Sequence, residues 1–339
     1  MIVVMSPNST QKQLDHVVAL VEEMGLKSHL IHGTNRTVVA AVGDKRGVDK
    51  SAIENLPGVE KIVPILAPYK VASREVKQEP TQIKITPGDV TVGGAQLAVI
   101  AGPCSVENRD GLLRVAQAVK EAGGVGLRGG AFKPRTSPYS FQGLAEKGLK
   151  YLAEAREQTG LAVVTEVVTV PHVELVAQYA DVLQVGARNM QNFMLLRALG
   201  EQPKPVLLKR GMSATLEEFL LAAEYIINAG NPNVILCERG IRTFEDYCRN
   251  TLALSLVPAI KRVSHLPILV DPTHGTGHAY MVEPMCLAAV AGGADGLLVE
   301  AHPDPEHALT DAAQQLDLGQ FKAMMAKLRR VAEAVDRTV

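Results

Sequence analysis

Three cations stand close together in a segment that cannot form one regular helix. The segment RGGAFKPRTSPYSFQG, residues 128–143, contains Arg128, Lys133 and Arg135 among three glycines and two prolines. Glycine costs a helix backbone entropy, and proline lacks the N–H that a helix requires. A stiff loop of this kind would hold its charges at fixed positions. The simplest alternative is a solvated loop with ordinary surface charges.

Further cations follow short apolar runs, each of which predicts a buried strand. Arg188, Lys209 and Arg239 stand at the ends of three such runs and bring the set to six. Six cations on one face of a protein with a net charge of −1 would repel one another unless anions bind among them. Guanidinium groups bind phosphate and carboxylate through two hydrogen bonds, and lysine adds a compact charge. The pattern predicts a site for phosphorylated, polyanionic small molecules.

A second set of side chains could hold a metal ion. Its members follow the first, seventh and eighth predicted strands or the loop after the eighth, and they are Cys104, His274, Glu300 and Asp311. A thiolate, an imidazole and two carboxylates suit Mn, Fe, Co or Zn better than Mg. A buried cysteine can equally be a small hydrophobic residue, and the other three can serve as turn, ion-pair and helix-cap residues. The residue pattern alone leaves both interpretations open.

Eight apolar runs alternate with amphipathic segments from residue 97 onward. They are LAVIAG, GLRGG, AVVTEV, VLQVGA, PVLLKRG, VILCERG, PILVDPTH and GLLVEAH. Nearly continuous apolar strands separated by helices indicate a parallel sheet buried on both faces. Eight regular units in about 240 residues favour a (β/α)8 TIM barrel over an open, doubly wound sheet. The strand ends of a barrel converge on one face, which would bring the cations, the metal-ligand candidates, Glu166 and Asp271 together.

The N-terminal part of the chain follows a different pattern. Residues 1–68 alternate short apolar strands and helical periods in the order βαββαβ, which predicts a ferredoxin-like α+β domain. Residues 69–96 predict a linker and a β-hairpin that turns at Pro87-Gly88-Asp89. We therefore expect a small domain over 1–68, a connecting segment over 69–96 and the barrel over 97–339.

Composition excludes several classes of function. The chain has 339 residues, of which 47% are hydrophobic and 21% charged, so it can bury the cores of more than one domain. Its 35 Lys and Arg residues nearly balance 36 Asp and Glu residues, which gives no general attraction for nucleic acid or for a membrane surface. No apolar run has the length of a membrane helix, the N-terminus lacks a signal peptide, and the four cysteines are widely spaced. These features predict a cytoplasmic protein with reduced thiols.

Several motifs together resemble one enzyme family. They are AGPCSVE, LRGG followed by KPRTSPYSFQG, GARN, LLKRG, CERGIRTFE, ILVDPTH and VEAHPDPE. Across nearly its whole length the chain is similar to 3-deoxy-D-arabino-heptulosonate 7-phosphate (DAHP) synthase of the short type with an N-terminal ferredoxin-like regulatory domain. The resemblance implies the condensation of phosphoenolpyruvate with erythrose 4-phosphate and the release of inorganic phosphate. This reaction is the first step of the shikimate pathway to aromatic amino acids.

The resemblance also implies roles for individual residues. The divalent metal ion would be bound by Cys104, His274, Glu300 and Asp311. Phosphoenolpyruvate would be held by Arg128, Lys133, Arg188, Lys209 and Arg239. Asp271 joins the substrate-binding set, and the phosphate of erythrose 4-phosphate would be bound by Arg135 and Thr136. The candidates for moving protons, positioning water or contacting the reacting groups are Lys133, Lys209, His274 and Glu166.

Regulation is a further implication of the resemblance. An aromatic amino acid, either tyrosine or phenylalanine, would bind to the N-terminal domain and inhibit the enzyme. His29 is the candidate allosteric residue, whereas Ile31 stands where a tyrosine-binding member would have a polar residue. Domains of this type act in pairs, so a homo-oligomer follows, with a tetramer favoured.

Three alternatives compete with this interpretation. A 3-deoxy-octulosonate 8-phosphate synthase uses the same donor with arabinose 5-phosphate, but its loop resembles KANRSS, whereas this chain has KPRTSP. A non-catalytic amino-acid sensor would be expected to lack the metal ligands or the phosphate-binding cations, and all of these are present. A metal-dependent aldolase of another family is the generic alternative.

Overall fold

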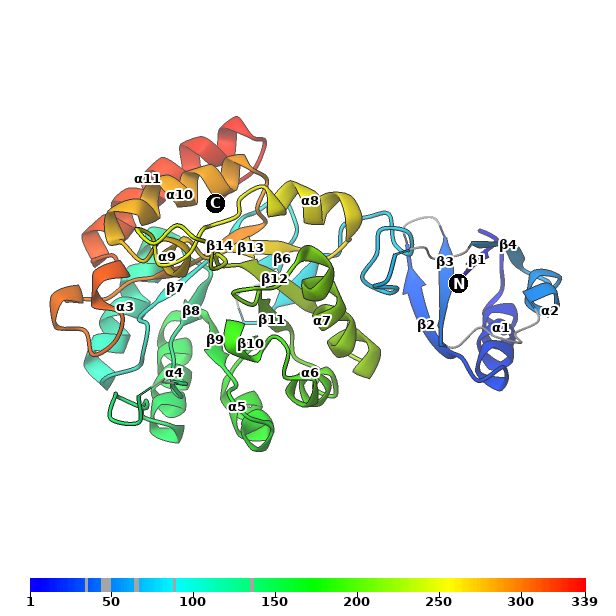
Figure 1. Cartoon of the computed structure of the whole chain (residues 1–339), viewed down its shortest axis with the longest axis horizontal. Coiled ribbons are helices and arrows are strands. Elements are labelled where there is room, and N and C mark those ends of the chain that lie inside the picture. Colours follow the sequence, from blue (N-terminus) through cyan, green and yellow to red (C-terminus); the bar gives the residue numbers. More distant parts are fainter. Residues whose placement is uncertain (34–35, 44–49, 64–66, 88–89, 135–136) are drawn as a thin grey trace. The chain divides into compact units, whose positions relative to one another are not determined.

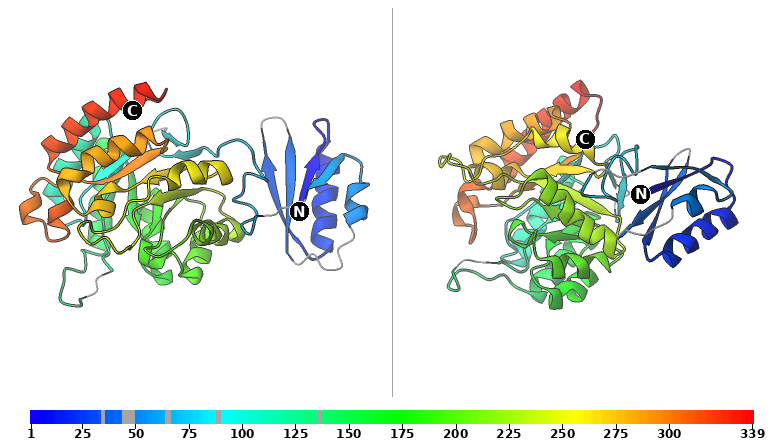
Figure 2. Two further views of the ribbon diagram at one scale, coloured as in Figure 1. Left: turned by 45° about the horizontal axis from the view of Figure 1, so that its top comes forward. Right: turned by 45° about the vertical axis from the view of Figure 1, so that its right-hand side comes forward.

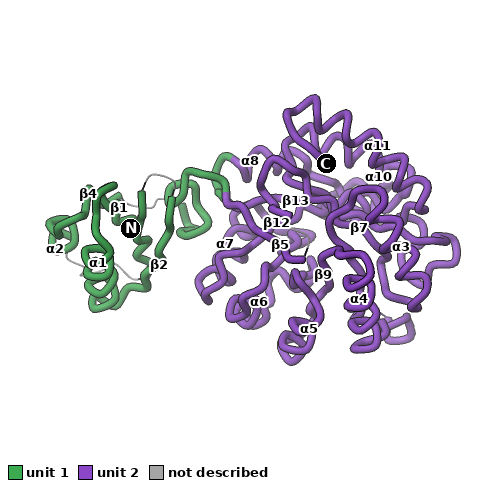
Figure 3. Tube along the Cα trace, turned by 180° about the vertical axis from the view of Figure 1, so that it is seen from behind, with its two compact units in different colours: residues 1–80, 262–265 green, residues 81–261, 266–339 purple. Residues whose placement is uncertain are grey.

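The chain folds into two compact units. The computed structural model describes all residues except 34–35, 44–49, 64–66, 88–89 and 135–136. The first unit comprises Met1–Pro80 with Arg262–His265, and the second comprises Thr81–Lys261 with Leu266–Val339 (Figure 3). The expected domain limits at residues 68 and 96 stay a proposal about which parts fold independently.

The first unit has the predicted ferredoxin-like arrangement. Its elements are β1 (Ile2–Met5), α1 (Gln11–Glu23), β2 (Lys27–His32), β3 (Thr37–Val42), α2 (Lys50–Glu54) and β4 (Val59–Val63). The strands form an antiparallel sheet in the order β2-β3-β1-β4 (Figure 1). Val3 and Met5 of β1 pack in one core cluster with Leu14, Val17 and Val21 of α1, whose three- and four-residue spacing predicts a helix with one apolar face.

The second unit is the predicted closed barrel. Its parallel strands are β7 (Ala98–Gly102), β8 (Gly126–Arg128), β9 (Ala162–Glu166), β10 (Val182–Val185), β11 (Val206–Lys209), β12 (Val234–Glu238), β13 (Ile268–Val270) and β14 (Gly296–Glu300). Each pairs with its neighbours in sequence, and β14 pairs with β7 to close the sheet. The α-helices that follow β7 along the chain are α3 (Arg109–Ala122), α4 (Glu146–Thr159), α5 (Val173–Tyr179), α6 (Phe193–Gly200), α7 (Leu216–Ala229), α8 (Leu256–Val263), α9 (Pro272–Thr276), α10 (Ala279–Ala291) and α11 (Leu318–Ala334). Figure 2 shows the outer helices around the strands.

A short hairpin closes one end of the barrel. Its strands, β5 (Ile83–Ile85) and β6 (Val90–Val92), pair in antiparallel fashion, and Gly88 and Asp89 of the expected turn lie outside the described residues. The four outer residues of this pair, Ile83, Ile85, Val90 and Val92, belong to the same core cluster as Ala98, Ala162 and Val182. These last three are the first residues of their strands. The hairpin therefore covers the N-terminal end of the barrel and leaves the C-terminal end for a site.

Membrane insertion finds no support among the described residues, because none of their helices combines the length and apolar character needed to cross a bilayer.

The position of the hairpin predicts where the chain can be shortened. Removal of residues 1–80 should leave a barrel that unfolds cooperatively, because the hairpin belongs to the second unit. Removal of residues 1–96 should lower the free energy of unfolding by more than about 5 kcal/mol, since four buried Ile and Val side chains are lost at about 1.5 to 3 kcal/mol each. Urea unfolding followed by circular dichroism compares the two proteins. Equal stabilities would show that the hairpin does not support the barrel.

Candidate active site

A cavity of about 340 Å³ lies at the C-terminal ends of the barrel strands. It brings together eight of the residues singled out from the sequence, which are Arg128, Lys133, Glu166, Arg188, Lys209, Arg239, His274 and Asp311. Cys104, Asp271 and Glu300 are almost fully buried and contact residues of this lining. Arg135 and Thr136 lie outside the described residues, and His29 is on β2 of the first unit.

Close strand packing brings Cys104 and Arg128 to the same place. Gly102 ends β7 beside Arg128 of β8, and a Cβ atom at Gly102 would lie 1.9 Å from the Arg128 carbonyl oxygen. Only glycine permits this approach. Just beyond it, Lys133 Nζ donates to the Cys104 carbonyl oxygen at 2.9 Å and to Cys104 Sγ at 3.1 Å. The lysine of the cationic loop is thereby fixed beside the thiol.

Cations outnumber carboxylates in the cavity lining. Among the described residues the lining cations are Arg128, Lys133, Arg188, Lys209, Arg239, Arg242 and Arg249, whereas the lining carboxylates are Glu166 and Asp311. Three of the cations form ion pairs, with the partners Glu300, Asp271 and Asp311. In the described part of the chain, Lys133, Arg188, Arg239 and Arg242 make no ion pair with a carboxylate. The cavity is therefore suited to a ligand with several negative charges.

The segment around Arg239 is fixed by the buried carboxylate of the preceding residue, Glu238, and Arg239 Nη1 itself donates to the Gly240 carbonyl oxygen at 3.3 Å. Glu238, at the end of β12, is fully buried; it accepts hydrogen bonds from Arg210 Nη1 at 3.0 Å and from the Gly240 N–H at 2.7 Å. Burial lowers the pKa of Arg239, the direction expected of a cation without a close anion. Arg128 is also incompletely satisfied, because its buried Nε atom has no hydrogen-bond partner. Both guanidinium groups could bind an anionic ligand.

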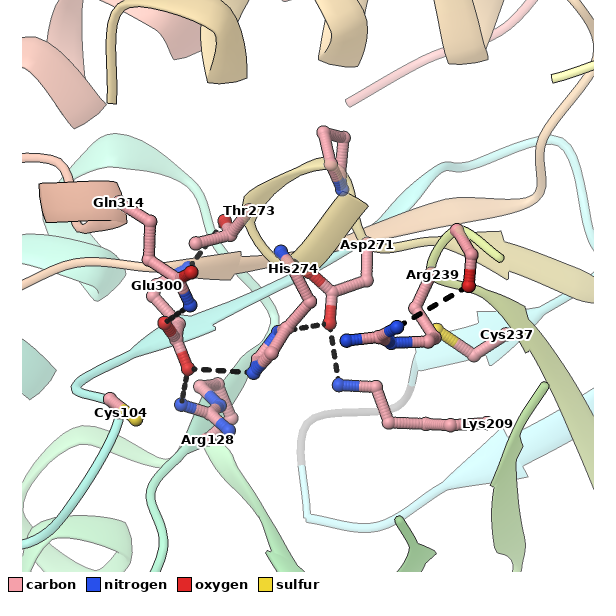
Figure 4. Close-up of polar contacts among 12 residues, drawn as sticks. Cys104, Arg128, Lys209, Cys237, Arg239, Asp271, Thr273, His274, Glu300 and Gln314 are labelled. Carbon is pink, nitrogen blue, oxygen red and sulfur yellow. Dashed lines mark hydrogen bonds and ion pairs between the residues drawn. The ribbon is translucent and has the colours of Figure 1, made fainter. Parts of the chain in front are cut away.

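Asp271 links a lysine to a histidine beneath the cavity (Figure 4). Its Oδ2 atom accepts from Lys209 Nζ at 2.5 Å and lies 2.7 Å from His274 Nδ1. Burial alone would raise the pKa of Asp271, but His274 and Lys209 hold it well below its usual value. Burial lowers the pKa of His274. A neutral His274 therefore donates its Nδ1–H to the ionised Asp271, and its Nε2 atom carries a lone pair.

The lone pair of His274 faces another acceptor. Nε2 lies 3.4 Å from Glu300 Oε1. Burial would raise the pKa of Glu300, but the positive charges of Arg128 and Lys133 lower it, so that this carboxyl is ionised as well. Two acceptors at this distance favour a cation between them. Cys104, Glu300 and Asp311 each offer a ligand atom, and these three atoms lie within 4.8 Å of one another. These three ligand atoms are close enough together to bind a divalent metal ion, and His274 adjoins Glu300 without belonging to the group of three.

The Cys104 thiol and the Asp311 carboxyl differ in protonation. Burial and the nearby Glu300 raise the pKa of Cys104 to about 12, and its Sγ atom donates to Asp311 Oδ2 at 3.3 Å. Asp311 is less buried; burial would raise its pKa, but Arg249 brings it down to about 2. A thiolate is the form of cysteine that binds metals, so metal binding would release the Cys104 proton.

Sequence reasoning missed several residues around the site. Arg242 and Arg249 line the cavity from the segment after CERG, where clustered cations in a non-helical stretch gave the same signal as the KPRT loop. Gln314 and Gln315 lie beside the metal-ligand candidates. Neutral glutamines give no comparable signal in a single sequence, because most of them are solvated.

Comparison with known proteins places the chain in one family. The description DAHP synthetase I family matches residues 75–337, and the DAHP synthase ferredoxin-like domain matches residues 1–67. A phospho-2-dehydro-3-deoxyheptonate aldolase of Thermotoga maritima is 52% identical over 335 residues, which cover 99% of this chain and 98% of that protein.

Solved structures agree with this assignment. The crystal structure of the DAHP synthase from Thermotoga maritima has a TM-score of 0.79 and 51% identity and covers 100% of this chain and 98% of that one. More distantly, a 2-dehydro-3-deoxyphosphooctonate aldolase of Syntrophotalea carbinolica is 34% identical over 275 residues, or 74% of this chain and 96% of that protein. The arrangement of barrel, N-terminal unit and cationic cavity, together with these matches over the whole chain, shows that the protein belongs to the DAHP synthase family.

Proposed function

We propose that the chain condenses phosphoenolpyruvate with erythrose 4-phosphate to give DAHP and inorganic phosphate. The observation that carries this proposal is a cavity with seven lining cations among the described residues, beside a thiol and two carboxylates suited to a metal ion. Phosphoenolpyruvate brings a phosphate and a carboxylate, and the sugar brings a second phosphate. Arg188, Arg239 and Lys133, which make no ion pairs among the described residues, are the best candidates to hold the first of these substrates.

The reaction joins C3 of the enol to the aldehyde carbon of the sugar. Water then adds at C2, and the resulting tetrahedral centre expels phosphate with cleavage of its C–O bond. A metal ion held by Cys104, His274, Glu300 and Asp311 would supply Lewis acidity toward the aldehyde oxygen. The native ion among Mn, Fe, Co and Zn is set by geometry and availability.

The residues around the cavity differ in their freedom to handle a proton. His274 uses Nδ1 to reach Asp271, and its Nε2 faces Glu300. Lys209 is paired with Asp271. Glu166 lines the cavity, and among the described residues its side chain accepts only one hydrogen bond, a long one of 3.4 Å from Gln184 Nε2. Glu166 is therefore our preferred group to orient the attacking water, whereas Lys209 holds substrate charge.

The direct test is phosphate release from phosphoenolpyruvate with a panel of aldose phosphates. Release that requires a four-carbon aldose phosphate supports the proposal. Release only with arabinose 5-phosphate would favour the octulosonate alternative, and no release with any aldose would favour the sensor.

The activity should depend on a metal ion that is bound by the Cys104 thiolate. Chelation should abolish turnover, and Mn²⁺ should restore it. Cys104→Ala should lower the affinity for the metal ion by more than about 100-fold, because loss of a residue that only supports a ligand already lowers it by about 10- to 100-fold. Cys286→Ala is the matched control, because Cys286 is equally buried but lies on α10 outside the cavity lining. Elemental analysis reports the bound metal. Full activity in protein shown to be metal-free contradicts the proposal.

The cationic loop at residues 128–143 should select the chain length of the acceptor sugar. Pro134 lines the cavity, and in the sequence it separates Lys133 from Arg135. Proline restricts the backbone at this position. A five-carbon sugar would strain or lose a charge-assisted contact worth about 1.5 to 3 kcal/mol. We expect kcat/KM to favour erythrose 4-phosphate over arabinose 5-phosphate by at least about tenfold.

Arg135→Ala should narrow this ratio and leave the KM for phosphoenolpyruvate nearly unchanged. Arg330→Ala is the control, since Arg330 is an exposed cation on α11. Equal specificity constants for the two sugars in the unaltered protein would show that the loop does not select acceptor length.

Regulation by an aromatic amino acid, with tyrosine and phenylalanine as the leading effectors, is part of the same proposal. In the first unit a cavity of about 430 Å³ combines apolar residues such as Ile31 and Val38 with charged ones such as Arg36 and Lys61. His29 lies on the same face of β2 as Ile31, two residues away. We further propose a cytoplasmic homo-oligomer, with a tetramer favoured, because such domains act by pairing.

Removal of residues 1–80 should separate catalysis from regulation. The shortened chain keeps every residue of the barrel cavity, so kcat should stay within a few-fold of the intact value. Inhibition of the intact protein by tyrosine or phenylalanine should disappear. Steady-state assays with each aromatic amino acid measure this, and an intact protein indifferent to all of them would rule out the regulatory role.

A further inference from the structure

Two adjacent glutamines are buried beside the metal-ligand candidates. Gln314, which ends a 3-10 helix at Ala312–Gln314, is 3% exposed, and Gln315 is 1% exposed. Burial of an amide is unfavourable unless its donors and acceptors find partners. Both side chains find them on or next to Cys104, Glu300 and Asp311, so their placement concerns the site as well as the fold.

Gln314 connects two carboxylates and a guanidinium group. Its Nε2 atom donates to Glu300 Oε2 at 2.7 Å (Figure 4). The same atom has a longer contact of 3.5 Å with Asp311 Oδ2. Its Oε1 atom accepts from Arg249 Nη1 at 2.7 Å. The orientation of the amide follows from chemistry, because only its nitrogen can donate to carboxylates and only its oxygen can accept from a guanidinium.

Gln315 connects the cysteine to the chain just before Asp311. Its Oε1 atom accepts from the Cys104 N–H at 3.0 Å, and its Nε2 atom donates to the Thr310 carbonyl oxygen at 2.8 Å. Ser105 Oγ and Thr310 Oγ1 form a second link at 2.7 Å between the same two segments. The loop after β7 is thus tied to the loop after β14 at the positions that carry Cys104 and Asp311.

We propose that Gln314 and Gln315 are positioning residues that hold Cys104, Glu300 and Asp311 in the arrangement that binds the divalent metal ion. The carboxylates of Glu300 and Asp311 repel each other, and a neutral amide that donates to both draws them together without adding charge. Gln315 does the same for the thiol by fixing the Cys104 backbone. The proposal rests on the metal-dependent function above and extends it to residues that touch neither the metal nor the substrates.

The test compares metal affinity in single variants of the full-length protein. Gln314→Met and Gln315→Met keep the length of the side chain but cannot donate to these partners, and Mn²⁺ has little affinity for a thioether. The dissociation constant for Mn²⁺, measured by competition with a chelator, should rise by about 10- to 100-fold in each variant. At saturating Mn²⁺, kcat should recover much of its parent value.

A spectroscopic readout separates the two glutamines. Co²⁺ bound to a thiolate gives a charge-transfer absorption that depends on the metal–sulfur geometry. Gln315→Leu, which introduces no new sulfur, should shift or weaken this band because it releases Cys104. Gln314→Leu should alter the band less, since its contacts are with the carboxylates.

A buried amide far from the site provides the matched control. Asn231 is 2% exposed, donates to the Gln202 and Lys204 carbonyl oxygens at 2.9 and 2.7 Å, and precedes β12 at the opposite end of the barrel. Asn231→Leu should lower stability but leave the Mn²⁺ dissociation constant unchanged. If folded glutamine variants also keep the parent constant within about twofold, the positioning role is wrong. If the unaltered protein itself binds no metal, the proposed function fails instead.

A second variant serves if the glutamine substitutions prevent folding. Arg249 is partly exposed, with a side-chain exposure of 36%, so Arg249→Met should fold. It frees the oxygen of Gln314 and also removes an ion pair with Asp311, and the Mn²⁺ dissociation constant should rise several-fold. An unchanged constant counts against the proposal. Where both variants fold, the double variant should be less than additive, because Arg249 acts partly through Gln314.

Discussion

The site depends on two carboxylates buried beneath a cavity that is rich in cations. Asp271 and Glu300 are each 1% exposed, and both are ionised. Removing one partner of a buried ion pair costs about 3 to 5 kcal/mol, because it leaves an uncompensated charge. The contacts that stabilise these two buried charges therefore also fix the side chains of Lys209, His274 and Arg128. The geometry of the candidate site and the local stability of the fold therefore depend on the same interactions.

The cavity cations without ion pairs have a different effect on the protein. Lys133, Arg188, Arg239 and Arg242 face the cavity without ion pairs among the described residues, so their mutual repulsion is an unfavourable term in the ligand-free protein. A ligand with several negative charges relieves this repulsion on binding. Positions set beforehand by the scaffold also lower the reorganisation needed during the reaction. The apolar core of the barrel, which the hairpin extends beyond the N-terminal strand ends, provides stability that offsets this repulsion.

Closure of the barrel explains how distant segments form one site. The metal-ligand candidates are spread over more than 200 positions, from Cys104 to Asp311. However, β14 pairs with β7, which places the first and last strands of the barrel side by side. The pairing of Glu300 with Gly102 aligns the two strand ends. The metal-ligand candidates and their glutamine neighbours then meet across this seam.

The sequence by itself determined the alternation of apolar strands and helices, the ferredoxin-like order of the first unit and the cations at strand ends. These features are local, since the hydrophobic period, the helix-breaking residues and the charges can be read from consecutive residues. Only the tertiary structure decided which cations lack ion pairs among the described residues, that the hairpin belongs to the barrel, and that Gln314 and Gln315 form hydrogen bonds with Glu300 and Cys104. Each depends on contacts between residues far apart in the chain, such as the 211 positions between Cys104 and Gln315. A neutral amide shows its role only when folding removes water and leaves it specific partners.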